Sequence, residues 1–358
     1  MKIGILTYHR SHNYGALLQA IALRKVLADM GHQVTYIDYW PNYQQHRYLL
    51  FSWKWMIKTQ KGIFGKIRYI KNCVINYKYR RQRIKVFNSF ISEYIQPYLS
   101  SCYDSYDIII HGSDQVWRKQ PEINTFDPFY FGKYDIKTGK KILYAASMGF
   151  LPENDSDFDV LKDNLFYLDA ISVREKNLAD FVLKLGYANV RQDLDPTFLL
   201  TSVRWKSLFK IGNCNNSYVF YYKLKDTFDI DKINAFAKMH DWETKIISGK
   251  DRHGKTIDNI EDPKLFLELL SNSNYVFTSS FHGLVFALLF HKPFYVSFNK
   301  IDRAYSLLSS LGLLSRLIAP KTDIPLENTP IDYDLVDRKL DLMRKESLNF
   351  LFKHCSEF

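Results

Sequence analysis

The first forty residues alternate between strand-like and helix-like stretches, and this alternation constrains the fold more than any other feature. An apolar run covers Lys2 to Thr7, a helical period covers Tyr14 to Met30, and a second apolar run covers Gln33 to Tyr39. A strand–helix–strand opening is typical of a doubly wound parallel sheet. The loop after the first strand, HRSHNYGA, is not G-x-G-x-x-G, so neither NAD nor FAD is expected. We therefore predict an α/β fold with parallel sheets, helices on both faces and no cofactor.

A second stretch of this kind lies in the C-terminal half. It consists of a predicted strand from Tyr275 to Thr278, a turn from Ser279 to Gly283, a helix from Leu284 to Phe290 and a strand from Phe294 to Phe298. The turn would place hydroxyls and backbone N–H groups at the carboxyl end of a buried strand, where a helix N-terminus favours an anion. His282 lies in the turn and could deliver a proton there. The alternative is a capping turn with a half-buried histidine.

The length of 358 residues favours two domains. An Asn-rich turn, GNCNNS, precedes a new strand that begins at Tyr218. We predict a first Rossmann-like domain at residues 1–201, a second at 202–330 and a C-terminal helix at 331–358 that returns to the first domain. Met1 leads directly into a strand, and no apolar run is long enough to span a bilayer. A cytoplasmic location is therefore expected.

Polar side chains follow four predicted strands of the first domain. They are Ser113 with Asp114, Ser147, Arg174 and Asp195. Because the carboxyl ends of parallel strands meet at one edge of a sheet, we expect these side chains to lie together. The loop after the first strand adds groups that can hydrogen-bond a sugar, namely His9, Arg10, His12, Asn13 and Tyr14. The structural alternatives are Asp114 as the cap of a following helix, Arg174 and Glu175 as a surface pair, Asp195 as a turn residue and Ser147 as a packing residue.

Positive charge is concentrated in one segment. Between His46 and Phe87 the chain has twelve Lys or Arg residues and no Asp or Glu, and without these twelve the net charge of +11 falls to −1. Aromatic residues are interleaved with the cations, and we expect two helices in this basic insert, at about residues 46–92. Such a segment suits an anionic membrane surface. Nucleic acid is a competing reading, but no nucleic-acid-binding motif accompanies the segment, and we predict none. A solvated basic helix pair is the structural alternative.

The four cysteines are far apart in the chain and form no C-x-x-C pair. They match neither a zinc site nor a disulfide framework, so no metal is expected. Free, buried thiols are predicted at Cys73, Cys102, Cys214 and Cys355.

Together these motifs resemble the polysaccharide pyruvyl transferase family. The resemblance covers most of the chain and rests on the NYGA-type loop, GSDQVW at 112–117, YAASMG at 144–149, SVRE at 172–175, LDPTFLL at 194–200, and TSSFHG at 278–283 followed by HKPF. It implies two Rossmann-like domains that face each other, as in GT-B glycosyltransferases. It also implies transfer of a pyruvyl group from phosphoenolpyruvate to sugar hydroxyls. The basic insert is longer than the family's pattern requires.

This chemistry would assign roles to the candidate residues. Protonation of the enol carbon of phosphoenolpyruvate needs a general acid, for which His282 is the candidate, and Asp114 would act on the acceptor hydroxyls. The carboxylate and phosphate of the donor need cations and N–H donors, predicted at Arg174, Ser279, Ser280, Phe281, Gly283 and Arg303. The acceptor side would be lined by His9, Asn13, Tyr14, Ser113 and Ser147. Arg303 could instead be a solvated charge at a helix start.

The predicted function is formation of a cyclic pyruvate ketal on a hexose of a surface polysaccharide or of its lipid-linked precursor, with release of phosphate. The enzyme would work in the cytoplasm, in peripheral contact with the inner face of an anionic membrane. A GT-B glycosyltransferase that uses a nucleotide sugar is the first alternative. It would need a carboxylate for the ribose, and no E-x-x-x-x-x-x-E run follows Phe281. A catalytically silent sugar-binding protein is the second alternative.

Overall fold

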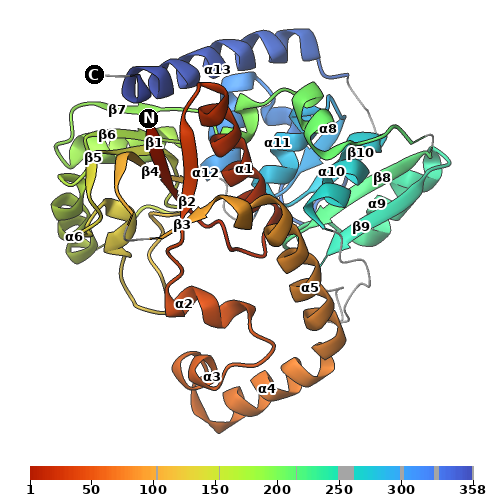
Figure 1. The fold of residues 1–358 in the computed structure, drawn as a ribbon. Helices are drawn as coiled ribbons and strands as arrows, with labels where there is room; N and C mark the ends of the chain where they lie inside the picture. The colour runs from red at the N-terminus through yellow and green to blue at the C-terminus, as the bar shows by residue number, and fades with distance from the viewer. Residues whose placement is uncertain are drawn as a thin grey trace. The chain divides into compact units, whose positions relative to one another are not determined.

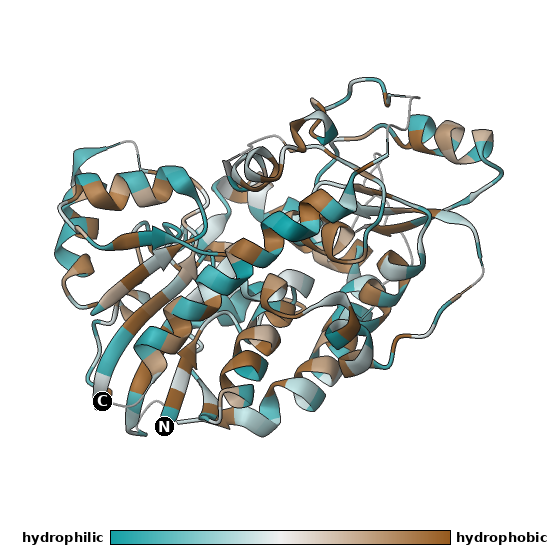
Figure 2. Cartoon of the chain, turned by 90° about the horizontal axis from the view of Figure 1, so that it is seen from above, coloured by the Kyte–Doolittle hydropathy of each residue, from teal (hydrophilic) through white to brown (hydrophobic). Residues whose placement is uncertain are grey.

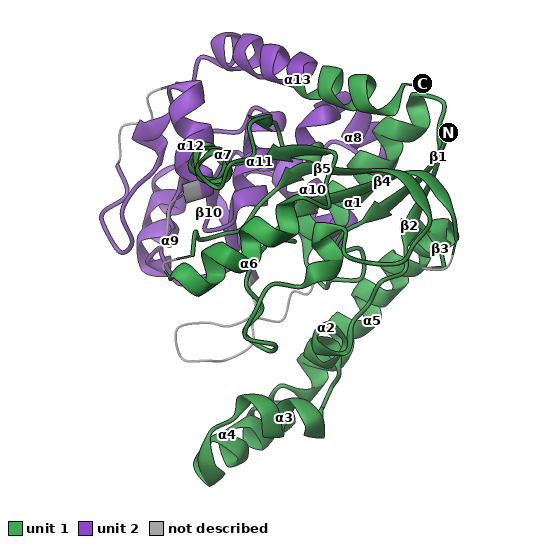
Figure 3. Ribbon diagram, turned by 90° about the vertical axis from the view of Figure 1, so that its left-hand side faces the viewer, with its two compact units in different colours: residues 1–196, 347–358 green, residues 197–346 purple. Residues whose placement is uncertain are grey.

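The structure is a computed structural model that describes residues 1–101, 104–152, 154–214, 216–248, 262–298, 302–325 and 330–356 (Figure 1). The chain divides into two compact units. Unit 1 comprises Met1–Pro196 and Ser347–Phe358, and unit 2 comprises Thr197–Glu346 (Figure 3). The last helix, α13 (Tyr333–Cys355), is divided between them. The domain boundary predicted from the sequence lies at 201/202, and the C-terminal helix predicted at 331–358 is treated there as a separate element.

Unit 1 is built on a seven-stranded sheet in the order β3-β2-β1-β4-β5-β6-β7. All neighbouring strands run parallel, which confirms the predicted α/β class. The strand order reverses between β1 and β4, and ligands of doubly wound sheets bind at such a reversal. The strands are β1 (Lys2–Leu6), β2 (Gln33–Ile37), β3 (Leu99–Ser100), β4 (Tyr106–Asp114), β5 (Thr138–Ala146), β6 (Ala170–Val173) and β7 (Val190–Gln192).

The helices of unit 1 fall into two groups. Those that accompany the sheet are α1 (Tyr14–Asp29), α6 (Asp155–Leu165) and α7 (Lys176–Lys184), and α1 is buried continuously from Tyr14 to Leu23 because it is apolar on nearly every side. Between β2 and β3 lie α2 (Asn42–Gln45), α3 (Trp53–Thr59), α4 (Gly62–Ile75) and α5 (Tyr77–Tyr94). The prediction of two helices in the basic insert was therefore wrong. Breaks at Gln60 and Asn76, where the cap residues leave helical geometry, separate α3, α4 and α5.

Unit 2 has a four-stranded parallel sheet in the order β11-β10-β8-β9. Its strands are β8 (Tyr218–Lys223), β9 (Glu243–Ser248), β10 (Tyr275–Thr278) and β11 (Phe294–Val296). Its helices, besides the first part of α13, are α8 (Ser202–Phe209), α9 (Ile230–Met239), α10 (Pro263–Asn272), α11 (Phe281–Leu289) and α12 (Asp302–Leu311). Five short 3-10 helices complete the described structure, at His46–Tyr48, Gln96–Tyr98, Pro128–Phe131, Pro196–Leu199 and Leu314–Arg316.

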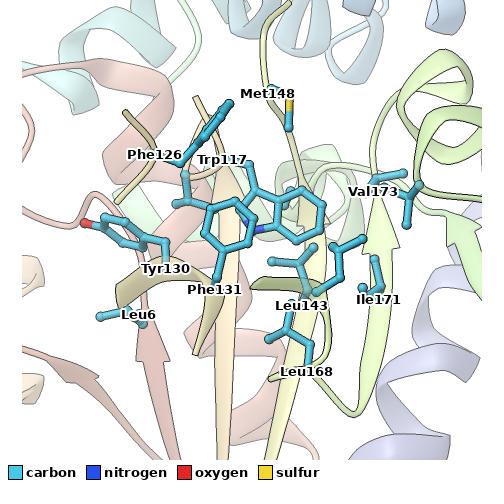
Figure 4. Packing of buried hydrophobic residues seen from close by; sticks show 14 of the residues in the cluster. Leu6, Trp117, Phe126, Tyr130, Phe131, Leu143, Met148, Leu168, Ile171 and Val173 are labelled. Carbon is cyan, nitrogen blue, oxygen red and sulfur yellow. The ribbon is translucent and has the colours of Figure 1, made fainter. Parts of the chain in front are cut away.

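Hydrophobic residues run through the strands, while the helices carry hydrophobic and hydrophilic residues along their length (Figure 2). In unit 1 the buried cluster on one face of the sheet includes residues of two motifs that were singled out in the sequence. Trp117 of GSDQVW stacks on Phe131 with ring centroids 4.8 Å apart, and Met148 of YAASMG lies beside Trp117 (Figure 4). Part of each motif therefore packs the core.

Three local predictions need correction. The helix after β10 begins at Phe281 and not at Leu284, because Ser280 is its N-cap, so His282 lies in the first turn of α11. No helix follows Asp114; this residue ends β4 with a φ of 72°, and a turn follows, so it is no helix cap. Cys214 is exposed, whereas Cys73 and Cys355 are buried free thiols as expected. Cys102 lies outside the described residues.

Candidate active site

In unit 1 the polar residues that follow different strands come together around a buried guanidinium. Arg174, directly after β6, donates from Nε to Ser113 Oγ and to the Ala145 carbonyl, each at 2.9 Å. Its Nη1 lies 2.7 Å from Asp195 Oδ2, and the two side chains are only 3% and 0% exposed. Ser113, at the end of β4, donates in turn to the Ala145 carbonyl at 2.7 Å. Three of the four predicted strand ends thus meet in one hydrogen-bonded cluster.

The fourth strand end, Ser147, joins the same edge through a different partner. Its hydroxyl donates to Glu175 Oε1 at 2.6 Å, and its backbone N–H donates to the Asp114 carbonyl at 2.9 Å. Arg174 and Glu175 are both buried. The alternative of a surface pair at a helix start was therefore wrong, because each side chain has a buried hydrogen-bond partner on a neighbouring strand end. Asp195 is likewise more than a turn residue, since its carboxylate balances the charge of Arg174.

Asp114 stands at the reversal of strand order and keeps its side chain half-buried. Its Oδ1 accepts a hydrogen bond from the backbone N–H of Gln115 at 2.8 Å. Burial, together with the nearby charge of Asp114, raises the pKa of the Tyr8 phenol well above its usual value. The Tyr8 hydroxyl donates at 3.1 Å to the carbonyl of Gln115, the residue after Asp114, so this phenol lies beside the carboxyl end of β4.

The loop after β1 is organised by a carboxylate that follows β2. Asp38 accepts hydrogen bonds from Arg10 Nε and Nη2, both at 2.7 Å, and His9 Nε2 lies 3.4 Å from its Oδ1. Hydrogen bonds from His9 and then Arg10 hold the pKa of Asp38 well below its usual range. Arg10 also lies 5.0 Å from the ring of Trp40. Sequence reasoning named the loop but missed Asp38 as the residue that holds it.

Other residues of the loop after β1, among them two predicted for the acceptor side, cap a helix or pack against aromatic rings. Asn13 is the N-cap of α1, and its side chain accepts from the Ala16 N–H at 3.1 Å. The ring of Tyr14 is buried and stacks on Phe87 at 5.3 Å. His12 is buried between Phe87 and Tyr48, and this burial lowers its pKa to about 4. Acceptor binding by Asn13 and Tyr14 stays a prediction.

In unit 2 the turn between β10 and α11 is held by its own hydroxyls. Thr278 Oγ1 donates to the Tyr222 carbonyl and accepts from Ser280 N–H, at 3.1 and 3.0 Å. Ser279 Oγ accepts from the N–H groups of Leu224 and Lys225, at 3.0 and 2.9 Å. Ser280 Oγ caps Gly283 N–H at 3.3 Å. These hydroxyls fix the direction in which the first turn of α11 presents its N–H groups.

Gly283 and His282 complete this turn. A Cβ at position 283 would lie 2.2 Å from Thr278 Oγ1, so only glycine fits without displacing the turn. His282 is buried in the first turn of α11, and its ring meets Phe281 edge-on at 5.4 Å. The guanidinium of Arg303, on α12, lies 5.5 Å from the centroid of the same Phe281 ring. Arg303 is half-buried, so it is not the fully solvated charge of the alternative reading.

One cation of unit 2 was missed by sequence reasoning. Lys223 ends β8 with a side chain only 10% exposed, and its Nζ lies 2.8 Å from Asp226 Oδ1. Lys321 Nζ reaches the other oxygen of Asp226 at 2.9 Å, and hydrogen bonds from these two lysines lower the pKa of that carboxyl. The usable signal was a lysine that closes the otherwise apolar run YVFYY. Among the described groups of unit 2, Lys223, Arg303 and the N-terminus of α11 are suited to an anion.

Two findings bear on other kinds of site. Within the described ranges, no three His, Cys, Asp or Glu side chains are grouped so that they could hold a metal ion. No helix in those ranges is both long and apolar enough to span a bilayer.

Comparison with known proteins gives a family match over most of the chain. The family model described as polysaccharide pyruvyl transferase matches residues 13–297. No functionally curated protein matches the sequence.

Solved structures resemble the chain at low identity. An uncharacterised protein from Klebsiella pneumoniae is 15% identical, with 66% of this chain and 85% of that chain covered and a TM-score of 0.39. A UDP-GlcNAc 2-epimerase from Methanocaldococcus jannaschii is 10% identical, with 96% and 93% covered and a TM-score of 0.42. The E. coli heptosyltransferase WaaC is 10% identical, with 96% and 99% covered and a TM-score of 0.40. Likeness of this degree does not extend any neighbour's activity to this chain.

Proposed function

Because the chain belongs to the polysaccharide pyruvyl transferase family, we propose that it moves a pyruvyl group from phosphoenolpyruvate onto two hydroxyls of a hexose. The product is a cyclic pyruvate ketal, and phosphate is released. The acceptor is a surface polysaccharide or its lipid-linked precursor, met at the inner face of an anionic membrane. The observation that carries the proposal is the position of His282, buried in the first turn of a helix whose N-terminus suits an anion.

The reaction balances without any further reactant. His282 gives a proton to C3 of the enol, and the cationic C2 takes the first sugar hydroxyl, which loses its proton. The C2–O bond to phosphate then breaks with its electron pair leaving on phosphate, and the second hydroxyl adds to C2 and loses its proton. Of the two hydroxyl protons, one replaces the proton given by His282 and the other leaves on the phosphate. Asp114 is the proposed acceptor of a hydroxyl proton, since its carboxylate stands half-buried at the reversal of strand order.

The donor's two anionic groups set the remaining roles. We assign its phosphate and carboxylate to the N-terminus of α11, at Phe281 and His282, and to Arg303 and Lys223. Arg174 was a candidate for the same task, but its guanidinium is balanced by the buried Asp195. Its proposed task is therefore to position Ser113, and with it the neighbouring Asp114. The backbone of Asp114 is also held by the N–H of Ser147. His9 is proposed to bind the acceptor, because its ring is fixed by the Thr7 carbonyl and by Asp38.

The test is phosphate release from phosphoenolpyruvate with a panel of hexosyl acceptors, compared between the wild type, His282→Ala and His291→Ala. His291 is the matched control because it lies in the same unit, just past α11, and is paired at the surface with Asp337. We expect acceptor-dependent release, a ketal in the mass of the product, and a loss of at least about 100-fold in His282→Ala only, as for removal of a general acid.

Two results would overturn the proposal. Release that is equally fast in His282→Ala would remove this residue from the chemistry. No release with any acceptor, together with liberation of a nucleotide from a nucleotide sugar, would establish the glycosyltransferase alternative instead.

A further inference from the structure

The basic arm, defined here as α3, α4 and α5 (Trp53–Tyr94), extends from the sheet of unit 1. Figures 1 and 3 show α3 and α4 at the far end of the arm, with α5 leading back to the sheet. The last turns of α5 are packed into the unit through the buried Phe87, Phe90 and Ile91. Arg83 fastens this end by a hydrogen bond of 2.6 Å to the His12 carbonyl. The outer helices are left with most of their surface in solvent.

The helix α4 carries its apolar stripe on the exposed side. Residues at spacings of four, three and four, which share one helix face, are Ile63, Ile67, Ile70 and Val74, and all are exposed with Phe64 beside them. A different face of α4, which carries Tyr69 and Cys73, packs inward. The Tyr69 hydroxyl accepts a hydrogen bond from the Ser52 N–H at 3.2 Å. Cys73 is buried, and its Sγ accepts a hydrogen bond from Arg80 Nη1 at 3.1 Å. A helix that packs its polar contacts inward and exposes its aliphatic face lacks the partner that this face needs.

The neighbouring helix α3 also exposes apolar side chains. Trp53 and Ile57, one helical turn apart, are 61% and 53% exposed, and Lys54 and Lys58 follow each of them in the chain. Tryptophan beside lysine is typical of the interface between water and lipid, where the ring lies at headgroup level and the ammonium reaches the phosphates. The apolar surface therefore has a cationic rim.

The charge of the arm indicates what covers it. Of the twelve cations between His46 and Phe87, only Arg47 forms an ion pair with a carboxylate inside the described ranges, at 2.6 Å from Glu122. The segment holds no acid to balance the others. A second copy of the chain would bring two such fields together and repel. Nucleic acid would match the charge but would leave isoleucine and valine in water, since its bases stack on aromatic rings.

We propose that the basic arm lies in the plane of an anionic bilayer, with the outer stripe of α4 (Ile63, Phe64, Ile67, Ile70 and Val74) inserted among the acyl chains. Lys66, Arg68 and Lys71, on the same helix, are then at the level of the lipid phosphates. This inference deepens the membrane setting of the proposed function. It does not depend on which reaction is catalysed.

The test is co-sedimentation of the full chain with vesicles, without any substrate. One set of vesicles is phosphatidylcholine alone, and the other contains phosphatidylglycerol as well. The arm variant is Phe64→Ser/Val74→Ser, whose side chains are 85% and 70% exposed. The matched control is Phe166→Ser/Val203→Ser, which removes equally exposed side chains (75% and 73%) outside the arm.

We expect binding to the anionic vesicles only, weakened at least about tenfold in the arm variant and unchanged in the control variant. Equal binding to both kinds of vesicle, or equal binding by the arm variant, would overturn the proposal. Sedimentation velocity of the protein without vesicles tests the rival occupant, which is a second copy of the chain. A dimer in the wild type that is lost in the arm variant would assign the stripe to that second copy. Phosphate release on a soluble acceptor should be the same in all three proteins, so a failure here is distinct from a failure of the proposed chemistry.

Discussion

At the scale of single residues, the site of unit 1 depends on an ion pair that is almost completely dry. Arg174 and Asp195 are both withdrawn from water, and neither would be stable there without the other. The desolvation cost is offset by their mutual attraction and by the hydrogen bonds of Arg174 to Ser113 and the Ala145 carbonyl. The same contacts hold the ends of β4, β5 and β6 together. This pair should therefore be a strong determinant of stability at the edge that carries Asp114.

Asp195→Asn should destabilise the protein by about 3 kcal/mol or more, because it leaves a buried guanidinium without its counter-charge. The measurement is urea-induced unfolding at neutral pH. Asp180→Asn is the control: it removes the carboxylate of the exposed pair with Lys176, which should change the unfolding free energy by less than about 0.5 kcal/mol. A similar effect of both substitutions would mean that Arg174 is hydrated in solution and free to bind an anion directly.

At the scale of elements, the sequence predicted best where a single periodicity decides the structure. The bounds of β1, α1 and β2 were each within two residues, because strand, helix and strand differ in their apolar spacing. The start of α11 was three residues off. Ser279 and Ser280 are both suitable caps, and which one caps is decided by the hydrogen bonds of Ser279 to Leu224 and Lys225, more than fifty residues away.

The site was predictable to the same extent. Parallel topology places strand ends at one edge, so the convergence of Ser113, Ser147, Arg174 and Asp195 followed from the fold. The pairing within this group could not be read from the sequence, because a guanidinium may bind a substrate anion or a protein carboxylate with the same geometry. Lys223 was missed because a single lysine after an apolar run is usually a surface residue.

The turn before α11 gives a prediction at this scale. Gly283→Ala should abolish most of the activity, because its Cβ would lie 2.2 Å from Thr278 Oγ1 and 2.9 Å from Thr278 Cβ, and the first turn with His282 would have to move. Overpacking of this kind costs about 1–3 kcal/mol of stability. Phosphate release and thermal unfolding measure the two effects. Gly212→Ala, where no atom lies within 4 Å, should change neither, and full activity in Gly283→Ala would separate this turn from catalysis.

At the scale of the whole molecule, acid stability should be set largely by histidines buried in unit 1. His111 is fully buried, with Nδ1 3.0 Å from the Tyr130 carbonyl and Nε2 2.8 Å from the Tyr134 hydroxyl, and burial lowers its pKa to about 3. Burial also lowers the pKa of His12 to about 4. Both rings are neutral in the folded state at pH values where the unfolded chain would protonate them. The pKa of Asp38 is lowered in the folded state, so its contribution to the free energy of unfolding is lost only in strong acid and does not change between pH 7 and pH 5.

The sign of the effect follows from proton binding. Between the unfolded histidine pKa near 6.5 and the folded values near 3 and 4, the unfolded state binds more protons, so stability falls as the pH falls. From pH 7 to pH 5 each of the two histidines should cost about 2 kcal/mol. Urea unfolding at the two pH values should show this loss, and His111→Gln should be less stable at pH 7 yet lose less on going to pH 5. If His111→Gln lost as much as the wild type, the ring of His111 would be accessible to protons in the folded protein, and the packing between β4 and the Tyr130–Tyr134 segment would be looser than its two hydrogen bonds indicate.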